Sequence, residues 1–244
     1  MNFNKYSEYY DLFYKNKKYS KEVKNIKKLV KFSKKDKVLE IGCGTGKHTF
    51  ELSKYCSQIL AIDKSKRMID VAKKKHLDLN ITFRNNEMFK IDETMKFDKI
   101  IMLFHVFSYF SDQKYINKVI NKLKLLIKPG GLIIFDFWNS DNIKKDSLRD
   151  TTKHIKFFNK IIKREGKIKK IKKNVYSIKY YFSIFNKDKK KTFLEKHIMR
   201  AFNREDIKKI FKNSFSLINF VNLLTLKKAS NKDFSILAII KKND

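Results

Sequence analysis

The chain has 244 residues, 42% of them hydrophobic and 14% aromatic, so it can bury the core of one sizeable α/β domain and is not a disordered chain. No apolar stretch approaches the roughly 20 residues needed to span a bilayer, and the N-terminus lacks the apolar core of a signal peptide. The two cysteines form no disulfide framework, and together these features predict a cytoplasmic location.

The formal net charge at pH 7 is +33, which would suit a nucleic-acid partner. However, only six of the 58 basic residues are arginines, the type favoured for bidentate recognition of bases and phosphates. The lysines are spread from Lys5 to Lys242. This distribution favours solvated surfaces, with attraction of acidic or phosphorylated small molecules as the second interpretation and nucleic acid as the least expected partner.

The first 20 residues are rich in tyrosine, including Tyr10, Tyr14 and Tyr19. One interpretation is a helix that packs these rings on the core. The other is a lid segment, residues 1–20, that covers a binding site. From Lys21 to Phe32, hydrophobic residues recur at the spacing of an amphipathic helix.

The segment Val38–Gly46 carries the most informative pattern. A predicted strand (Lys37–Ile41) contains Glu40 and is followed by glycines at positions 42, 44 and 46, and then by a helix-compatible segment that ends near Tyr55. Glycines adopt backbone angles closed to other residues and let a ligand lie against bare main chain. The spacing differs from the dinucleotide-binding G-x-G-x-x-G. The pattern therefore predicts a strand, a tight ligand-binding turn and a helix.

Further strands and helices alternate along the chain. The predicted strands are Gln58–Ile62, Ile81–Arg84, the fully apolar Phe97–Phe104, and Leu132–Phe137, and the predicted helices are Lys66–Lys75 and Tyr115–Ile127. This alternation predicts a parallel sheet, and ligands of such sheets bind outside the carboxyl ends of the strands. Polar residues lie at or near these ends: Glu40, Asp63, Glu87, His105 and Asp136.

From Thr151 onward the pattern changes to near-alternating apolar and basic residues. It gives four predicted strands, Lys153–Lys163, Ile168–Lys173, Val175–Phe185 and Phe193–Phe202, separated at Arg164–Gly166 and Asn186–Asp188. Such a series predicts an antiparallel meander. A helix (Arg204–Phe211) and two closing strands (Ser216–Leu224 and Phe234–Ile240) follow. We expect a single domain, residues 1–244, with residues 149–201 as an insertion.

The order of motifs resembles that of the class I S-adenosylmethionine-dependent methyltransferases over nearly the whole chain. The resemblance rests on the E-x-G-x-G-x-G spacing of Glu40–Gly46 and on Ile59–Asp63, Asn86–Met88 and Leu126–Gly131. It implies a Rossmann-like α/β fold, in which a seven-stranded, mostly parallel sheet has helices on both faces, with the antiparallel strand-rich insertion added. A narrower similarity, to small bacterial methyltransferases of polysaccharide and antibiotic-sugar pathways, rests on Tyr10–Tyr19, Phe104–Tyr109, Phe135–Trp138 and Lys196–Phe202.

The resemblance implies S-adenosyl-L-methionine as the cofactor. Asp63 would accept hydrogen bonds from the two ribose hydroxyls, or alternatively cap the following helix. Glu40 would meet the ammonium group directly or through water, and Glu87 would accept from the adenine amine, unless it is a solvated loop carboxylate. The predicted cofactor-binding residues are Glu40, Gly42, Cys43, Gly44, Gly46, Asp63, Lys64, Met68, Glu87, Met88, Tyr19 and Phe104.

Methyl transfer from a sulfonium needs positioning, exclusion of water and, for some acceptors, a base. His105, just past the fourth strand, is the predicted base because a histidine titrates near neutrality; a core histidine bonded to backbone is the alternative. Tyr109 and Tyr14 complete the predicted catalytic set. Tyr109 occupies the position where the amino-sugar enzymes carry a histidine, which counts against nitrogen methylation of an amino sugar. The predicted acceptor-binding residues are Tyr10, Trp138, His197 and Arg200, the arginine being suited to a phosphate or carboxylate.

Other methyltransferase classes lack support in the sequence. The fourth strand is followed by Phe104–Phe107 instead of the N/D-P-P-aromatic loop of enzymes that methylate amino groups in DNA, and neither Cys43 nor Cys56 has the proline neighbour of cytosine-C5 enzymes. Asp141 and Asn142 lack the partner acid of metal-dependent, catechol-type enzymes, so no metal is expected.

The sequence thus predicts an S-adenosylmethionine-dependent methyltransferase that acts on a small, phosphorylated or nucleotide-linked sugar or another surface-polysaccharide precursor, enclosed by residues 1–20 and 149–201. The alternatives are an RNA- or protein-modifying methyltransferase recruited by the basic surface, and a cofactor-binding protein without catalytic activity. The sequence leaves the oligomeric state and the methylated atom open. His48, His76 and His154 are expected to be ordinary structural residues.

Overall fold

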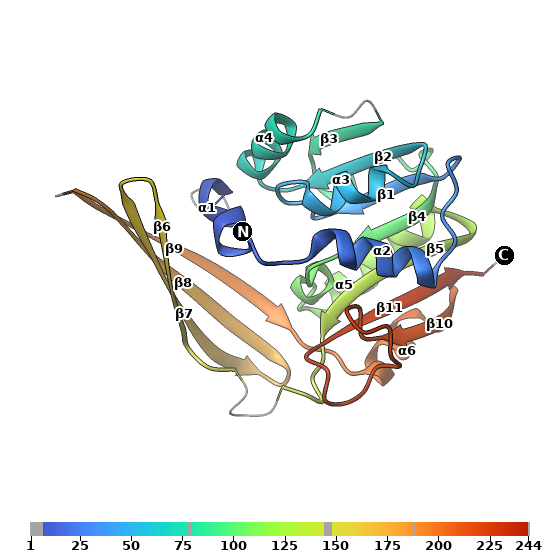
Figure 1. Ribbon diagram of the computed structural model, residues 1–244. Helices are drawn as coiled ribbons and strands as arrows, with labels where there is room; N and C mark the ends of the chain where they lie inside the picture. Colours follow the sequence, from blue (N-terminus) through green and yellow to red (C-terminus); the bar gives the residue numbers. More distant parts are fainter. Residues whose placement is uncertain (1–6, 78–79, 144–147, 188, 244) are drawn as a thin grey trace.

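A seven-stranded sheet forms the centre of the molecule in the computed structural model, which describes residues 7–77, 80–143, 148–187 and 189–243 (Figure 1). The strand order is β10-β11-β5-β4-β1-β2-β3. Strands β1 to β5 run parallel, whereas β11 is antiparallel to both β5 and β10. The strands are β1 (Lys37–Ile41), β2 (Gln58–Asp63), β3 (Ile81–Asn85), β4 (Phe97–Met102), β5 (Ile127–Trp138), β10 (Phe215–Val221) and β11 (Ser235–Lys242).

Helices cover both faces of this sheet. They are α1 (Ser7–Phe13), α2 (Tyr19–Leu29), α3 (Lys47–Ser53), α4 (Lys66–Lys75), α5 (Gln113–Leu126) and α6 (Arg204–Phe211), with short 3₁₀ turns η1 (Met88–Lys90) and η2 (Val106–Tyr109). Successive side chains of a strand point to opposite faces, so each strand supplies two cores. Leu39 packs with α5 and α6, whereas Val38 packs with α2 and α3. None of the described helices is long and apolar enough to cross a membrane.

Polar side chains fix the starts of three helices. The Ser65 hydroxyl accepts from the amide of Met68 at 3.3 Å, and the Asp112 carboxylate accepts from the amide of Tyr115 at 3.1 Å. Asn203 and Asp206 form a reciprocal capping box at the start of α6. Such caps satisfy amide groups that have no partner within the helix. Helix α4 is therefore capped by Ser65, and the alternative role considered for Asp63, as the cap, is wrong.

A second sheet of four antiparallel strands stands apart from the central one, at the left of Figure 1, and is inserted between β5 and α6. Its strands are β6 (Thr151–Phe157), β7 (Lys160–Lys172), β8 (Val175–Asn186) and β9 (Lys189–Arg200), paired in that order. Its inner face packs Ile162, Phe182 and Ile184 against Tyr9 and Phe13 of α1. The predicted fold class, including the strand-rich insertion, is confirmed.

The predicted strand break at Arg164–Gly166 is wrong, because β7 runs through these residues without interruption. Arg164 is a buried residue of the inner face, and a Cβ on Gly166 would lie 2.8 Å from the Thr151 side chain and 2.9 Å from the Tyr180 ring. The glycine therefore serves close packing between strands. The real turns lie at Phe158 and Asn174, which have φ values of 50° and 57°.

Candidate functional site

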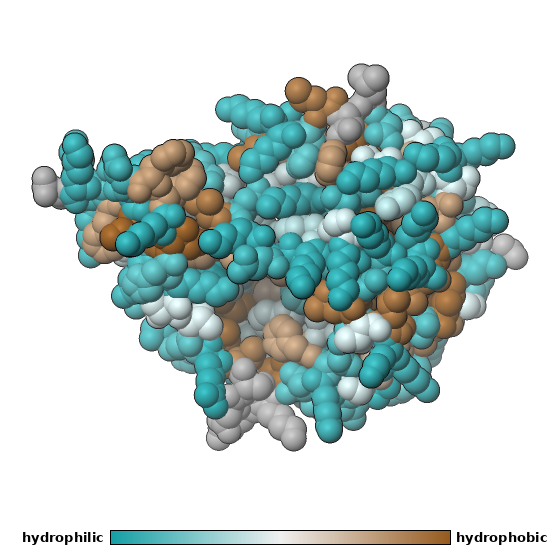
Figure 2. All heavy atoms as spheres, viewed as in Figure 1, coloured by the Kyte–Doolittle hydropathy of each residue, from teal (hydrophilic) through white to brown (hydrophobic). Residues whose placement is uncertain are grey.

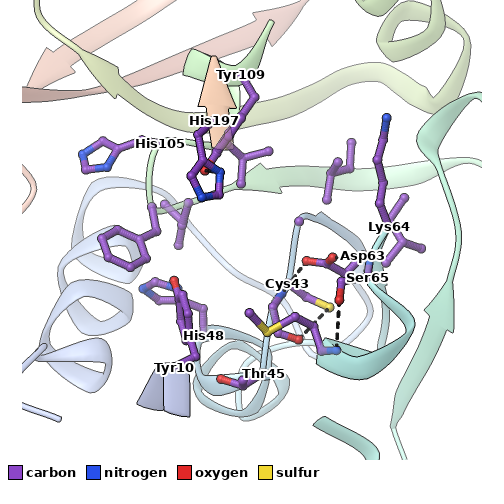
Figure 3. A pocket seen from close by; sticks show the side chains of 18 of the residues that line it. Tyr10, Cys43, Thr45, His48, Asp63, Lys64, Ser65, His105, Tyr109 and His197 are labelled. Carbon is purple, nitrogen blue, oxygen red and sulfur yellow. Dashed lines mark hydrogen bonds between the residues drawn. The ribbon is translucent and has the colours of Figure 1, made fainter. Parts of the chain in front are cut away.

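One cavity of about 640 Å³ lies between the carboxyl ends of the central strands, the second sheet and the N-terminal helices. It sits where the strand order reverses between β1 and β4, the usual ligand position in open α/β sheets. Figure 3 shows part of its lining. Most predicted site residues line it: Tyr10, Tyr14, Tyr19, Gly42, Cys43, Gly44, Asp63, Lys64, Met68, Glu87, Met88, Phe104, His105, Tyr109, Trp138 and His197.

The glycine turn brings bare main chain to the cavity. Gly42, Gly44 and Gly46 have φ values of 75°, 55° and 80°, which other residues rarely adopt. The amides of Gly42 and Cys43 both donate to the carbonyl of Ile62, at 2.8 and 3.0 Å, and so tie the turn to β2. Gly46 does not line the cavity; the position of its missing Cβ is 2.8 Å from the Phe83 ring.

Asp63 links the glycine turn to the start of α4 from the end of β2. Its Oδ2 accepts from the amide of Gly44 at 2.9 Å and its Oδ1 accepts from the amide of Ser65 at 2.8 Å. Burial raises the pKa of this carboxyl, while the two amides lower it. Each carboxylate oxygen has two lone pairs, so both oxygens retain one acceptor position toward a pair of hydroxyl groups.

Glu40 lies beneath the cavity and is not part of its lining. Its Oε2 accepts from the Thr49 hydroxyl at 2.5 Å. Burial raises the pKa of this carboxyl to about 8, although the Thr49 hydrogen bond works in the opposite direction. Because Glu40 is buried and does not line the cavity, its carboxyl group does not face a ligand there directly.

We call the part of the cavity lined by the glycine turn, Asp63–Ser65 and Asn86–Met88 the cofactor half, after the role that the sequence predicts for it. Its end at Met68, Glu87 and Met88 combines apolar and charged side chains. Met68 and Met88 are buried, and Glu87 is near Lys64, with Oε2 and Nζ 3.6 Å apart. About half of each of these two charged side chains is exposed. Buried methionines beside two partly exposed charged groups suit a flat ring with polar edges.

His105 begins the turn η2 with a φ of 65°, just past β4. Its amide donates to Oδ1 of Asp136 at 2.9 Å, and its Nε2 lies 3.4 Å from Oδ2 of the same carboxylate. Burial lowers the pKa of His105, while the Asp136 charge opposes this shift. The neutral imidazole can therefore accept a proton, and Asp136 stabilises the charged form that results.

Tyr109 of the turn η2 and His197 of β9 point toward each other (Figure 3). The Tyr109 hydroxyl lies 3.2 Å from Nδ1 of His197. Burial raises the pKa of Tyr109 and lowers that of His197 to about 4, so both groups are neutral near pH 7. Tyr180 of β8 packs edge-on to His197, with ring centroids 5.6 Å apart. Together these rings form an uncharged wall.

Arg200 does not line the cavity. Its Nη1 donates to Oε1 of Gln113 at 3.2 Å, and its guanidinium lies 4.8 Å from the Phe202 ring centroid. The physical reason is the alternation of a strand: residues 197 and 200 are three apart, so they point to opposite faces. The prediction that both would face an acceptor is wrong on this point.

The sequence interpretation missed several polar lining residues, among them His48 and Tyr180. His48, expected to be an ordinary structural residue, lines the cavity, and its Nε2 lies 2.7 Å from Oε2 of Glu22 in α2. Tyr180 also lines the cavity from β8. The alternation of β8 could have indicated Tyr180, because Ile178, which also lines the cavity, is two residues away on the same face. No local signal pairs His48 with Glu22.

The N-terminal segment is tied to the cofactor half by Asp11. Its Oδ1 accepts from the Thr45 hydroxyl at 2.7 Å, and its Oδ2 lies 2.5 Å from Nζ of Lys75 in α4. Thr45 belongs to the glycine turn and lines the cavity. Helix α1 is therefore attached to the turn that the sequence assigns to the cofactor.

Two buried polar atoms of lining residues have no hydrogen-bond partner within the described ranges: Oη of Tyr19 and Nε1 of Trp138. Leaving such a group unpaired costs about 1–3 kcal/mol. Tyr19 lies on the cofactor side, where Nζ of Lys47 is 5.3 Å from its ring centroid. Trp138 lies on the other side, 6.2 Å from His105 between ring centroids. The lining therefore fits ligands with polar groups in both halves.

Comparisons with known proteins agree with this geometry. Residues 38–131 match the family model described as a methyltransferase domain. A dTDP-3-amino-3,4,6-trideoxy-alpha-D-glucopyranose N,N-dimethyltransferase from Streptomyces venezuelae is 23% identical over 137 residues, which are 54% of this chain and 57% of that protein. The chain spans about half the length of the curated relatives it matches.

Solved structures match over nearly the entire chain. An S-adenosylmethionine-dependent methyltransferase from Clostridium acetobutylicum superimposes with a TM-score of 0.81 at 22% identity, covering 99% of both chains. A sugar N-methyltransferase from Streptoalloteichus sp. superimposes with a TM-score of 0.80 at 16% identity, covering 96% of this chain and 93% of that one. These matches confirm the fold, and the domain match confirms the predicted cofactor, S-adenosylmethionine.

Proposed function

We propose that this chain, a class I methyltransferase by its fold and by the domain at residues 38–131, transfers the methyl group of S-adenosylmethionine to a small, sugar-like acceptor. A nucleotide-linked sugar or another surface-polysaccharide precursor is the acceptor class that we favour. The observation that carries the proposal is the single cavity that joins the glycine turn and Asp63 to the aromatic wall of the second sheet.

In this proposal the residues at the ends of β1 and β2 hold the cofactor. Asp63 accepts the ribose hydroxyls with its two remaining acceptor positions, and Met68 and Met88 enclose the adenine ring. The buried hydroxyl of Tyr19 gains a hydrogen-bond partner. Glu40 supports the turn from below through Thr49. When bound, the cofactor supplies an electrophilic methyl group on a sulfonium.

The chain itself contributes positioning, exclusion of water and a proton acceptor. His105 is neutral because burial lowers its pKa, and it faces the cavity beside Asp136. We assign it the proton that an acceptor nitrogen or hydroxyl loses. Tyr109 and His197 orient the acceptor from the opposite side.

We propose nitrogen as the acceptor atom because of the aromatic lining, although Tyr109 stands where the amino-sugar enzymes carry a histidine. We call the part of the cavity toward the second sheet the acceptor half. Aromatic rings line it, among them Tyr14, Phe104, Tyr109 and Tyr180. The faces of such rings attract an ammonium group, so they suit both a protonated amine and its methylated product. The sugar N-methyltransferase with the same fold is consistent with this choice.

A phosphate or nucleotide part of the acceptor would lie outside the acceptor half of the cavity. The described lining residues of that half are aromatic, apolar or histidine, and the cavity's lysines, Lys47 and Lys64, belong to the cofactor half. Figure 2 shows a hollow with apolar residues between the second sheet and the central sheet, bordered by hydrophilic side chains. Such a border suits the charged part of an acceptor.

The test is transfer of label from methyl-labelled S-adenosylmethionine to separate pools of small metabolites, RNA and protein, with Asp63→Ala as the control for cofactor dependence. We expect label in the small-metabolite pool only. Label confined to RNA or protein would overturn the acceptor class. Transfer to no pool, with cofactor binding intact by calorimetry, would indicate a binding protein without catalytic activity.

A further inference from the structure

Arg164 is a buried arginine of β7 that lies just behind the acceptor half of the cavity. It is 4% exposed and belongs to the inner face of the second sheet. It is not part of the cavity lining. An arginine is seldom buried to this extent unless its charge has partners, because removing it from water is costly.

The contacts of Arg164 connect the second sheet to the N-terminal segment. Its Nη1 donates to the hydroxyl oxygen of Tyr14 at 3.3 Å. Its guanidinium carbon lies 4.6 Å from the ring centroid of Phe13, 5.6 Å from that of Tyr14 and 4.8 Å from that of Tyr180. Cation–π contacts of this kind are stronger when buried. Arg164 thus holds two rings of the N-terminal segment and one of its own sheet.

Two of these rings, Tyr14 and Tyr180, line the cavity. Tyr14 also packs at 4.8 Å from Tyr10 and edge-on at 5.0 Å from Phe104, measured between ring centroids. The position of its ring is therefore fixed by neighbours on three sides, one of which is Arg164.

The direction of the hydrogen bond has a chemical consequence. A tyrosine hydroxyl has one proton to donate and can also accept. Because the Tyr14 oxygen accepts from the guanidinium, its own proton cannot point at that nitrogen. An arginine has no acceptor, so the Tyr14 hydroxyl proton remains for donation to another group. Because Tyr14 lines the cavity, that group can belong to a ligand there.

We infer that Arg164 is a positioning residue of the acceptor site, which holds Tyr14 as a hydrogen-bond donor toward a neutral oxygen of the acceptor, such as a hydroxyl or ring oxygen. This role rests on the proposed function, since it needs an acceptor in the cavity. Arg164 itself touches neither ligand.

The experiment compares Arg164→Met, Arg164→Lys, Tyr14→Phe and the double variant Tyr14→Phe/Arg164→Met in the labelled-methyl assay with rising concentrations of the small-metabolite pool. Loss of the hydrogen bond from Tyr14 to a neutral acceptor oxygen predicts a rise of about three- to tenfold in the apparent KM for the pool in Arg164→Met. Tyr14→Phe should match it, and the double variant should be no worse than either single change. Arg164→Lys should fall between wild type and Arg164→Met.

A purely structural role would give a different pattern. It would lower the melting temperature, and the rise in KM of the double variant would be the product of the rises in the two single variants. That result would overturn the inference. An unchanged KM in folded Arg164→Met would also overturn it. The matched control is Arg204→Met, because Arg204 also donates through Nη1, to the carbonyl of Ala229 at 3.1 Å, but on α6 outside the cavity lining. Its KM should be that of wild type.

A second readout keeps the inference separate from the proposed function. Arg164→Met should speed hydrogen exchange in residues 7–14, while the affinity for S-adenosylmethionine by calorimetry stays within about twofold. Unchanged exchange would overturn the inference even if methyl transfer is observed. If the wild type transfers no methyl group but exchange rises, the proposed function fails and the attachment of Tyr14 by Arg164 stands.

Discussion

The hydroxyl of Tyr109 and Nδ1 of His197, 3.2 Å apart, join the turn after β4 to the second sheet. This contact is part of the cavity wall and joins the segment matched by the methyltransferase domain to the inserted sheet. His197 is buried and Tyr109 is half-buried, and in this environment both groups are neutral near pH 7.

His197 should make folding stability depend on pH. Burial lowers its pKa from 6.5 to about 4, so between these values the unfolded chain binds a proton that the folded chain does not. The stabilisation is therefore complete above about pH 6.5 and is lost as the pH falls toward 4, by about 3 kcal/mol in full. Chemical unfolding of wild type and His197→Gln at pH 7 and 4.5 measures this loss.

The loss of unfolding free energy between pH 7 and 4.5 must be compared between wild type and His197→Gln, because burial also lowers the pKa of His48 and His105. Those groups act in the same direction in both proteins. A wild type that loses no more stability on acidification than His197→Gln would contradict the expected shift.

Replacing Asp63 by alanine should weaken cofactor binding by about 1–3 kcal/mol, because hydrogen bonds to a charged acceptor are lost and the Gly44 and Ser65 amides lose their acceptor. Calorimetry with S-adenosylmethionine and its demethylated product measures the effect. Asp70→Ala is the matched control, since Asp70 pairs with Lys66 on the surface of α4. Equal affinities of the two variants would remove Asp63 from the cofactor site.

The glycine turn offers a graded pair of substitutions. At Gly44 an added Cβ meets nothing within 4 Å, so alanine there adds only the strain of a positive φ, about 1–2 kcal/mol. At Gly42 the Cβ would lie 2.6 Å from a methyl carbon of Val106. Thermal unfolding should therefore show Gly42→Ala to be the less stable variant, and equal melting temperatures would argue against the geometry of the turn.

Deleting residues 1–20 should abolish methyl transfer while the central sheet still folds. The deletion removes Tyr10 and Tyr14 from the acceptor half and the Asp11 contact from the glycine turn. Some affinity for S-adenosylmethionine should remain, since Asp63 and the glycines are intact. Circular dichroism, calorimetry and the transfer assay report these three properties. Full activity of the shortened protein would show that the tyrosines only pack on the core.

The cofactor half was predictable because its determinants are local. The strand, the three glycines and Asp63 lie within one stretch of 26 residues from Val38. Each of these features follows from local backbone conformation or from a hydrogen bond to the backbone. The N-terminal cap of α4 at Ser65 was missed because Asp63 and Ser65 are both suitable cap residues. The Asp63 carboxylate instead accepts from the amide of Gly44. The roles assigned to the site residues remain predictions.

The acceptor half was less predictable because it depends on pairs that are distant in sequence. His48 pairs with Glu22, and Tyr14 with Arg164, 150 positions apart. The sequence predicts a strand break at Arg164 because two charged residues followed by a glycine are typical of a turn. Burial against the rings of Phe13 and Tyr14 in the N-terminal segment, which no local pattern reveals, keeps Arg164 within the strand.

The inserted sheet leaves and rejoins the central domain at one point. The amide of Phe202 donates to the carbonyl of Trp138 at 2.8 Å, and the amide of Ser140 donates to the carbonyl of Phe202 at 2.9 Å. Residues 139 and 202 are paired as an isolated bridge. A segment whose ends meet in this way can be exchanged for another, or shortened to a brief connection, without moving the strands on either side. The fold thus permits exchange of the inserted sheet, and with it of the second-sheet residues that line the cavity, without a change in the order of the central strands.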